Sequence, residues 1–528
     1  MTQTIELRVS PKVAATPDLL DKECARALRL APGRVKRADI LRRSIDARQR
    51  RVAVNLKVAV HVDCIDEAAV AFEPVEYRPV GDAPQAIVVG AGPAGLFAAL
   101  ELIEAGVKPV VLERGKDVDS RRRDMVAISR EGTVDPDSNY CFGEGGAGAY
   151  SDGKLYTRSK KRGPVEKVLR IFHQHGAQRD ILVDAHPHIG TDRLPSVIKA
   201  MRQTIEACGG EVHFGTRVSK LIMENGKVTG ASDTQGHSWH GPVILATGHS
   251  ARDVYAMLIE AGIDLEAKGL AVGVRLEHPQ ELIDRLQYHS PEGRGKYLPA
   301  AEYSMLTRVD DRAVYSFCMC PGGYIIPAAS APGQLVVNGM SPANRGTRWA
   351  NSGMVVEVLP DDIEAEPGTH PELRMMHFQE RIEKAFFEAA GRTQKAPAQR
   401  MTDFVAGKAS GSLPRSSYPP GLTPARVDLL LPEPVSRRLR EGFRVFDSKQ
   451  RGFLTAEATV IGDETRTSSP VRVPRDAESL CHIKCQGLYP CGEGAGYAGG
   501  IVSAAIDGIM TARALAASLQ EHRHPEEL

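Results

Sequence analysis

The sequence predicts an α/β protein with three parts: a doubly wound domain, a mixed α/β domain inserted into it, and a small α+β domain at the N-terminus. Two similar stretches support the doubly wound domain. AIVVGAGPAGLFAALELIEAG at 86–106 has the pattern of a buried strand, a glycine-rich turn and a helix, and YPCGEGAGYAGGIVSAAIDG at 489–508 repeats that order. Between them, from about 270 to 450, the chain changes to strands and prolines around one clear helix at 371–391. This change predicts the insertion.

The predicted boundaries follow these changes. Residues 1–80 are assigned to the N-terminal domain, 84–269 to the first part of the doubly wound domain, 270–449 to the insertion and 450–528 to the return. With 528 residues, the chain is long enough for two or three hydrophobic cores.

The N-terminal domain is predicted from four short elements. TIELRVS alternates as a strand, Thr16–Pro17 opens a helix, and ADILRRSIDAR and RVAVNLKVAVHVD are two further strands. This domain carries no recognisable chemistry, so a docking or scaffold role is expected. RPVGDAP at 78–84 is the predicted linker.

The doubly wound domain is predicted from alternating strands and helices. PVVLERG at 109–115 supplies the second strand, 193–210 a helix, and GPVILATGHS at 241–250 another buried strand. Residues 211–236 have the pattern of an antiparallel meander with its turn at Asn225–Gly226.

The charge balance of the chain argues against one class of function. The 67 basic and 66 acidic residues nearly cancel, which argues against nucleic acid as a partner, because such binding needs an excess of Lys and Arg. Two basic runs, Ser120–Asp124 and Ser159–Gly163, are predicted to be solvated faces.

Nothing in the sequence predicts a membrane partner. The N-terminus has no apolar targeting segment, and the apolar stretch at 86–113 contains glycines and charges. The nine cysteines form no disulfide framework, which predicts a reducing, cytoplasmic location.

The first glycine-rich turn predicts a dinucleotide site. Gly90 makes the tight turn, Gly92 lets the backbone approach a pyrophosphate, and Gly95 lets the helix pack close to the strand. Pro93 and Ala94 open the helix, whose N-terminus offers free N–H groups to phosphate.

The end of the second strand supplies a further contact. Glu113 lies eighteen residues after Gly95, where a carboxylate can accept hydrogen bonds from a ribose, and Arg114 follows it. The whole pattern is shared by NAD-binding and FAD-binding proteins.

The rest of the chain resembles the FAD-binding half of the glutathione-reductase-like flavoproteins. By this resemblance, Thr216–Val218 passes the adenine, with Val218 in contact. Ala246, Thr247 and Gly248 then return the chain beside the first glycine turn. The resemblance covers roughly 85–270 and 450–525, and it implies FAD as the cofactor.

The last motif of these flavoproteins is Gly-Asp, whose acid holds the ribityl chain. Here the motif is Gly492–Glu493, so the longer glutamate leaves a direct ribityl bond open. Gly499, Gly500 and Ile501 then begin a helix whose N-terminus is expected to face the flavin ring. The two glycine-rich stretches are therefore expected to hold opposite ends of one FAD.

A narrower resemblance, carried by CFGEGGAGAYSDGKL, YSFCMCPGGYIIPA, VVNGMS and ETRTSSPVRVPR, is to a family of bacterial FAD-dependent dehydrogenases with an N-terminal extra domain and no established substrate. In similar flavoproteins the loop matching Cys141–Arg158 runs along the flavin edge. Gly146 and Gly148 permit that approach, and Lys154 would place a positive charge near the ring.

Three further groups are candidates for contact with substrate. Arg466, in the polar loop 464–472, could grip an anionic group with two parallel bonds. Cys318 and Cys320 are expected on one face of a strand, where a structural role is the alternative, and Tyr324 is expected near the same site.

Some chemistry is not predicted. Cys481 and Cys485 have only His482 nearby, so no metal site is expected. There is no second G-x-G-x-x-G unit, so reduction is expected from a substrate, a transient NAD(P)H or another electron carrier. Cys491 lies in the last motif, but covalent attachment of the flavin is not expected.

The sequence therefore predicts an FAD-dependent oxidoreductase that moves hydride between noncovalent FAD and a small organic substrate. Two alternatives stay open. One is a flavin hydroxylase, which would consume oxygen with NADPH, and the other is a non-catalytic flavin-binding sensor or assembly factor.

Overall fold

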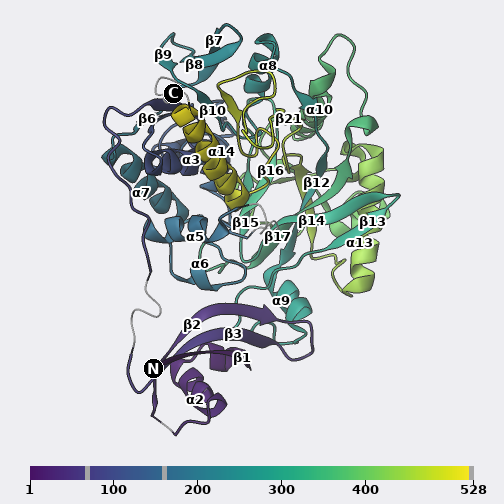
Figure 1. Ribbon diagram of the computed structural model, residues 1–528. Helices are drawn as coiled ribbons and strands as arrows, with labels where there is room; N and C mark the ends of the chain where they lie inside the picture. The colour runs from purple at the N-terminus through teal and green to yellow at the C-terminus, as the bar shows by residue number, and fades with distance from the viewer. Residues whose placement is uncertain (32, 66–71, 157–162, 522–528) are drawn as a thin grey trace.

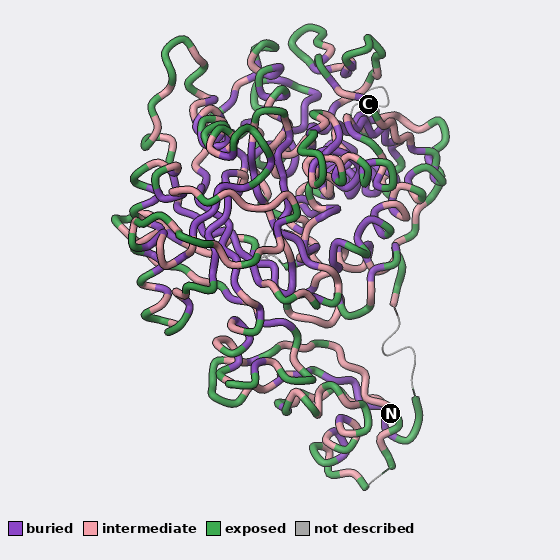
Figure 2. Tube along the Cα trace, turned by 180° about the vertical axis from the view of Figure 1, so that it is seen from behind, coloured by how far each residue is buried: buried purple, intermediate pink, exposed green. Residues whose placement is uncertain are grey.

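A computed structural model describes residues 1–31, 33–65, 72–156 and 163–521. Residues 159–162 of the predicted basic run Ser159–Gly163 lie outside this range, as do residues 157 and 158 of the glycine-rich loop. Buried residues are concentrated in the body that is built around two large sheets, while the N-terminal domain extends from it (Figures 1 and 2).

The N-terminal domain is a three-stranded antiparallel sheet with the order β1-β3-β2. Its elements are β1 (Thr2–Val9), α1 (Pro11–Ala14), α2 (Pro17–Ala27), β2 (Val35–Asp46) and β3 (Ala53–Val62). Leu20 and Cys24 of α2 pack on valines of β3, so the helix and sheet share a small core. The predicted strand, helix, strand and strand are all present.

The N-terminal sheet joins the main body at the outer edge of β2. Arg43 donates two hydrogen bonds to the Asp184 carboxylate, from Nε at 2.6 Å and from Nη2 at 3.1 Å. The Ala185 amide donates to the Arg43 carbonyl at 2.9 Å, and the two segments form a parallel bridge there. Residues 184 and 185 therefore continue the edge of the N-terminal sheet.

The first sheet of the main body has five parallel strands in the order β22-β10-β4-β5-β6. The strands are β4 (Gln85–Val89), β5 (Lys108–Leu112), β6 (Glu211–His213), β10 (Val243–Leu245) and β22 (Leu488–Pro490). β4 is central, and the last strand of the chain pairs at one edge. The two ends of the sequence-predicted domain thus meet in one sheet.

Alternate residues of these strands face different layers. Val88 and Val111 pack on the helical side, against α3 (Pro93–Glu104), α7 (Leu194–Ala207) and α14 (Ile501–Glu521). Ile87 and Val110 pack on the other side, against α8 (Arg252–Glu260) and an antiparallel meander. Apolar residues on both faces explain why β4 and β5 are continuous hydrophobic runs.

The meander consists of β7 (Val218–Glu224), β8 (Lys227–Asp233) and β9 (Ser238–His240). Asn225 and Gly226 form the turn between the first two strands with φ of 52° and 77°. Positive φ at both positions is typical of the turn predicted there.

The second sheet has seven strands in the order β13-β14-β17-β12-β20-β18-β19. They are β12 (Leu270–Pro279), β13 (Leu306–Val309), β14 (Arg312–Cys320), β17 (Trp349–Val358), β18 (Ala396–Arg400), β19 (Leu422–Pro424) and β20 (Thr459–Glu464). β20 lies in the segment 450–528 and yet pairs between β12 and β18. The return segment therefore contributes to both sheets, which differs from the predicted boundary at residue 450.

The longer helices that pack on this sheet in the described chain include two that the prediction missed. The predicted helix is α10 (Arg374–Ala389), and the others are α9 (Gln280–Tyr288) and α13 (Glu433–Lys449). In α13, Val435, Leu439, Phe443 and Phe446 are buried at helical spacing. That spacing was a usable signal for a helix.

Short elements complete the described chain. They are β11 (Glu266–Ala267), β15 (Tyr324–Pro327), β16 (Val337–Met340), β21 (Val471–Arg472), α4 (Arg121–Glu131), α5 (Val165–Gln174), α6 (Asp180–Val183), α11 (Met401–Ala406), α12 (Val427–Leu430), and 3₁₀ turns at Gly146–Gly148, Pro360–Asp362 and Pro371–Leu373.

Among the described residues, one helix is long and apolar enough to cross a membrane by length and composition alone, and it is α14. In the structure 56% of its apolar window is buried inside the protein. Its contact with α3, visible in Figure 1, accounts for this apolar character.

Candidate cofactor and substrate site

One cavity of about 860 Å³ runs between the carboxyl ends of the first sheet and the second sheet. Most of the predicted site residues lie in its wall. These are Gly90, Gly92, Pro93, Ala94, Glu113, Arg114, Gly146, Gly148, Lys154, Val218, Thr247, Gly248, Arg466, Glu493, Gly500 and Ile501. Residues more than four hundred positions apart in sequence are thus brought together around a single space.

Two of the predicted cofactor-binding residues, Gly95 and Gly492, lie beneath the cavity wall and do not line the cavity. A Cβ on Gly95 would lie 1.9 Å from the Gly90 carbonyl oxygen, so this glycine is needed for the close packing of α3 on β4. The Gly492 amide donates to the Asp507 carboxylate at 2.7 Å, and the residue does not line the cavity. Both residues shape the site without facing it.

The first glycine turn presents backbone to the cavity. Gly90 has φ of 105°, and a Cβ there would lie 2.5 Å from the Ala246 carbonyl oxygen. No side chain caps α3, which begins after Gly92. The first turn of the helix therefore keeps N–H groups and a positive dipole end for an anionic ligand.

Glu113 ties the turn together. Its Oε2 accepts from the Ala91 amide at 2.8 Å, and its Oε1 accepts from the amides of Gly115 and Gly143, both at 2.9 Å. A carboxylate has about four acceptor positions, so one position on Oε2 stays available to a ribose hydroxyl. Glu113 thus shapes the site as well as lining it.

A buried arginine lies beneath the glycine-rich loop. Arg121 is fully buried, and its guanidinium donates to the carbonyls of Glu144 at 2.7 Å, Asn139 at 2.7 Å and Gly146 at 3.1 Å. Among the described residues no carboxylate forms an ion pair with it, and burial lowers its pKa. The predicted solvated face of Ser120–Asp124 is therefore wrong for Arg121, which adds positive charge behind Gly146.

A second helix N-terminus reaches the same cavity. Gly500, Ile501, Ser503 and Ala504 at the start of α14 line it. A Cβ on Gly508 would lie 2.1 Å from the Ala94 carbonyl oxygen, so the glycine lets α14 lie against α3. The positive ends of two helices therefore converge on one ligand.

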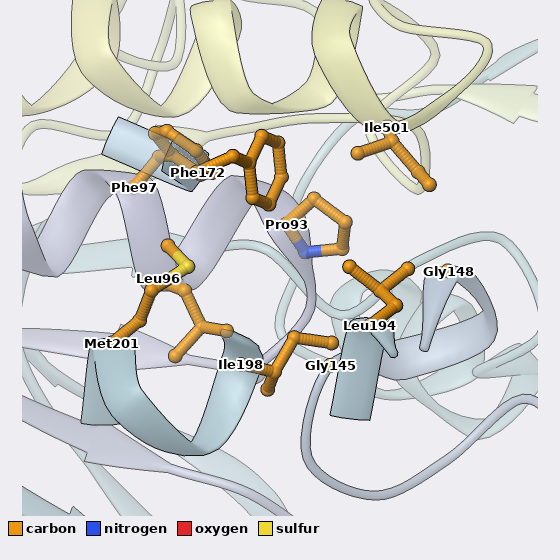
Figure 3. A pocket seen from close by; sticks show the side chains of 10 residues that line it. All are labelled: Pro93, Leu96, Phe97, Gly145, Gly148, Phe172, Leu194, Ile198, Met201 and Ile501. Atoms are coloured by element: carbon orange, nitrogen blue, oxygen red, sulfur yellow. The ribbon is translucent and has the colours of Figure 1, made fainter. Parts of the chain in front are cut away.

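Behind the loop, the packing leaves only a small apolar void of about 10 Å³ (Figure 3). Pro93, Phe97 and Ile198 are among its walls, with Gly145 and Gly148 of the loop at one side. A void this small and this apolar holds no ligand. It separates the loop from the helical core rather than forming a site.

The acid of the last motif lies in the cavity wall and contacts a histidine. Glu493 Oε1 is 3.9 Å from His249 Nε2, and the Glu493 side chain is 27% exposed. Burial raises the Glu493 pKa to about 7, which the charge of Lys268 only partly opposes. Burial, with the charges of Arg466 and Arg252, lowers the pKa of His249 to about 3.

The guanidinium of Arg466 does not have the free N–H groups that the predicted substrate anchor requires. Its Nε and Nη2 each donate to the Glu383 carboxylate at 3.1 Å. The other N–H groups are used by Ser330, by Gln334 at 2.9 Å and by Ser250 at 3.2 Å. All five donors are occupied by protein groups, which favours a structural role in the wall, and the substrate anchor stays a prediction.

Cys318 and Cys320 do not share a face. Cys318 has φ of 47° at a register shift between β14 and β17, which breaks the alternation of the strand. Cys318 lines the cavity, whereas Cys320 is buried with its Sγ 3.4 Å from Arg275 Nη2. Burial raises the Cys320 pKa to about 12, so it stays a thiol, which favours the structural alternative for this residue.

Tyr324 is also outside the cavity. It begins β15 and is half-buried against the core of the first sheet. Of the four predicted catalytic residues, Lys154 and Arg466 line the cavity. Arg466 is paired with Glu383, whereas Lys154 forms no ion pair with the described residues.

Sequence reasoning missed the residues that surround Lys154. Tyr156, His186, Glu302 and Arg345 line the same end of the cavity. His186 Nδ1 contacts Glu302 Oε1, although the two residues are 116 positions apart. No local pattern connects such residues, so only the fold could reveal them.

The fold and this cavity define a protein that binds FAD. Residues 84–238 match the family described as "FAD binding domain", residues 269–467 match "FAD-dependent protein, C-terminal domain-like", and residues 1–61 match a domain of unknown function. FAD is the cofactor, as predicted, and the protein is of the FAD-dependent oxidoreductase class.

An "Uncharacterized protein" of Clostridium beijerinckii is 41% identical over 514 residues, which is 94% of this chain and 95% of that protein. The chain belongs to the same family of FAD-dependent proteins. The protein FixC of Salmonella typhi is 26% identical over 229 residues, 39% of this chain and 47% of FixC.

Solved structures are more distant. A geranylgeranyl bacteriochlorophyll reductase-like protein from Thermoplasma acidophilum is 14% identical with a TM-score of 0.32, covering 84% of this chain and 83% of that one. CtdE in complex with FAD is 10% identical with a TM-score of 0.31, covering 84% and 90%.

Proposed function

We propose that this protein transfers hydride between noncovalently bound FAD and a small organic substrate. One observation carries the proposal: the cavity lined by both glycine-rich stretches continues to a wall from the second-sheet domain, which includes Tyr315 and Cys318 of β14 and Tyr303 just before β13. A cavity of about 860 Å³ is in the range of cofactor and ligand sites. The first sheet supplies the cofactor end and the second sheet the substrate end.

The residues of the cofactor end fit an anionic dinucleotide. The uncapped N-terminus of α3 would hold the pyrophosphate, Glu113 the ribose, and the N-terminus of α14 the flavin ring. The buried charge of Arg121 supports the same polarity. When bound, FAD supplies the two-electron chemistry.

The arrangement of strands supports placement in the glutathione-reductase-like superfamily, with a Rossmann-like sheet. Noncovalent binding is supported by Cys491, which is fully buried, does not line the cavity and has a pKa raised by burial. A reducing, cytoplasmic location is supported by all nine cysteines being free thiols.

An anaerobic assay tests the proposal. Purified FAD-loaded protein would be mixed with NADH, NADPH and a panel of hydroxy acids and amines, and bleaching of the oxidised flavin spectrum would be followed. A donor that bleaches the flavin supports an oxidoreductase. If no donor changes the flavin, a non-catalytic role is favoured.

The same assay with oxygen separates hydride transfer from hydroxylation. A dehydrogenase turns over with an artificial electron acceptor in place of oxygen. A hydroxylase consumes oxygen together with NADPH and incorporates one oxygen atom into an organic product. Incorporation of labelled oxygen would contradict the proposal of hydride transfer.

A further inference from the structure

We propose that His186, Glu302 and Lys154 form a proton-transfer and anion-binding site at the substrate end of the cavity. The substrate class would be an organic anion, such as a carboxylate, with a hydroxyl on the carbon that is oxidised. This inference rests on the proposed hydride transfer and adds the residues and the substrate class.

Two short segments are paired to form this site. The Leu155 amide donates to the Pro187 carbonyl at 2.8 Å and the Ile189 amide to the Gly153 carbonyl at 3.1 Å. Lys154 and His188 are bridge partners in an antiparallel arrangement. The register makes Tyr156 the cross-strand neighbour of His186, and their rings lie 4.7 Å apart.

This pairing orients the imidazole of His186. Nδ1 contacts Glu302 Oε1, which fixes one edge of the ring, and Tyr156 packs on the ring. The opposite nitrogen, Nε2, has no partner among the described residues, and His186 and Glu302 both line the cavity. A histidine held by a carboxylate, with its second nitrogen exposed to a cavity, is the arrangement of a general base.

Charged groups from three neighbouring segments face His186: Glu302, Arg345 and Lys154. The bond from Glu302 raises the His186 pKa, while burial and the charges of Arg345 and Lys154 oppose the rise. Arg345 is paired with Asp152, at 2.6 Å from its Nη2. Glu302 is neutralised when His186 is protonated, which leaves Lys154 as the unbalanced charge.

Lys154 therefore defines the charge of the substrate. It lines the cavity and forms no ion pair with the residues that the structure describes. A single ammonium beside a protonatable imidazole would attract one anionic group. Tyr303 and Phe317 in the same wall would pack on the organic part of that molecule.

The chemical step balances with FAD as the oxidant. The C–H and O–H bonds of the substrate break and a C=O bond forms. The hydride carries the electron pair to FAD, and the hydroxyl proton goes to Nε2 of His186. The substrate is oxidised by two electrons, the cofactor is reduced by two, and Lys154 keeps the anionic group in place.

Benzoate tests the anion site without knowledge of the substrate. Its dissociation constant for the FAD-loaded protein would be measured by calorimetry between about pH 6 and about pH 9. We expect the affinity for benzoate to fall about tenfold over that range as His186 loses its proton. We also expect benzoate binding to be accompanied by uptake of a proton from the buffer. Lys154→Met should weaken binding at least tenfold, and His186→Asn should abolish the pH dependence.

Matched controls are available. Lys199→Met removes an exposed lysine paired with Asp119, and His237→Asn removes a histidine paired with Asp233 on the meander. Both should bind benzoate as the wild type does. Failure of benzoate to bind, or equal binding by the wild type and the Lys154 and His186 variants, would overturn the anion site.

The proton-transfer role is tested by flavin reduction. With any hydroxy acid that bleaches the wild-type flavin, His186→Asn should reduce the rate about a hundredfold or more. Glu302→Gln should move the pH midpoint of the rate downward, because the amide no longer favours the protonated imidazole. An unchanged rate and pH profile in both variants would overturn the role while leaving hydride transfer intact. If no donor bleaches the flavin, hydride transfer fails, and benzoate binding still decides the anion site.

Discussion

The guanidinium of Arg466 and the carboxylate of Glu383 form a buried ion pair through two hydrogen bonds of 3.1 Å. Arg252 grips the same carboxylate with two bonds of 2.8 Å. Burial would raise the Glu383 pKa, but the two arginines outweigh it and lower that pKa to about 2. One carboxylate therefore joins the second-sheet domain to α8 and to the loop after β20.

This pairing predicts a loss of stability when the fork of Arg466 is removed. Arg466→Lys keeps the charge but leaves Ser250, Ser330 or Gln334 without a donor, which should cost about 1–3 kcal/mol. Arg466→Met leaves Glu383 with one arginine and the Thr465 hydroxyl, and should cost about 3–5 kcal/mol. Urea denaturation would measure both, with exposed Arg392→Lys as the control. Unchanged stability together with a slower flavin reduction would restore a substrate role.

Glu113 predicts a direct effect on cofactor affinity. Glu113→Ala removes the acceptor of three backbone amides and the proposed ribose contact. FAD binding should weaken by about 1–3 kcal/mol, measured by recovery of flavin fluorescence on dilution. Glu131→Ala, at the exposed end of α4, should bind FAD normally. Equal affinities would show that Glu113 does not contribute to FAD binding.

The hydrogen bonds of buried Arg121 predict that its replacement would change the shape of the glycine-rich loop. Arg121→Met leaves the carbonyls of Asn139, Glu144 and Gly146 without their common donor. The loop should lose its shape, and FAD affinity should fall at least about tenfold. Arg123→Met, two residues away on the exposed side of the same helix, is the matched control. Similar flavin content in the two variants would contradict a role for the buried charge.

The close contact at Gly508 predicts that a larger residue there would disturb the alignment of the N-termini of α3 and α14. A methyl group in Gly508→Ala would be placed against a backbone oxygen, which cannot move without displacing α3. We expect α14 to shift, with loss of stability and of FAD. Met510→Leu, at an exposed position on the same helix, should change neither. Flavin content and thermal denaturation would be compared for both variants.

Glu493 predicts a pH dependence in the FAD-free protein. Its folded pKa of about 7 is above the unfolded value of 4.5, so the folded state holds a proton that the unfolded state releases first. The free energy of unfolding should therefore fall as pH rises from about 4.5 to about 7, relative to Glu493→Gln. Urea denaturation at several pH values would show this. Parallel curves for the wild type and Glu493→Gln would contradict it.

The parts of the site that could be predicted are those encoded locally. Gly90, Gly92 and Glu113 lie within one βαβ unit, so their spacing specifies their geometry. Arg121 could not be distinguished from Arg122 and Arg123, because identical residues differ only in which side of α4 the core covers. The face of Cys318 depended on a bulge, which strand alternation cannot foresee.

The second sheet was predicted less well for a related reason. β20 pairs with β12 and β18, which are far from it in sequence, so the boundary at residue 450 was drawn where composition changed rather than where pairing ended. His186 and Glu302 likewise meet only because the two segments fold together. Such contacts depend on topology, whereas turns and helix starts depend on neighbouring residues.

The bond between Arg43 and Asp184 lies two residues before His186. A coupling free energy is reciprocal: whatever fixes one side of a contact strengthens the other by the same amount. If a molecule in the cavity orders the His186 segment, the contact between Asp184 and the N-terminal sheet should strengthen with it. Conversely, a protein that takes the outer edge of β2 for itself will loosen that segment. The N-terminal domain does not line the cavity, but it is attached to the segment that carries His186.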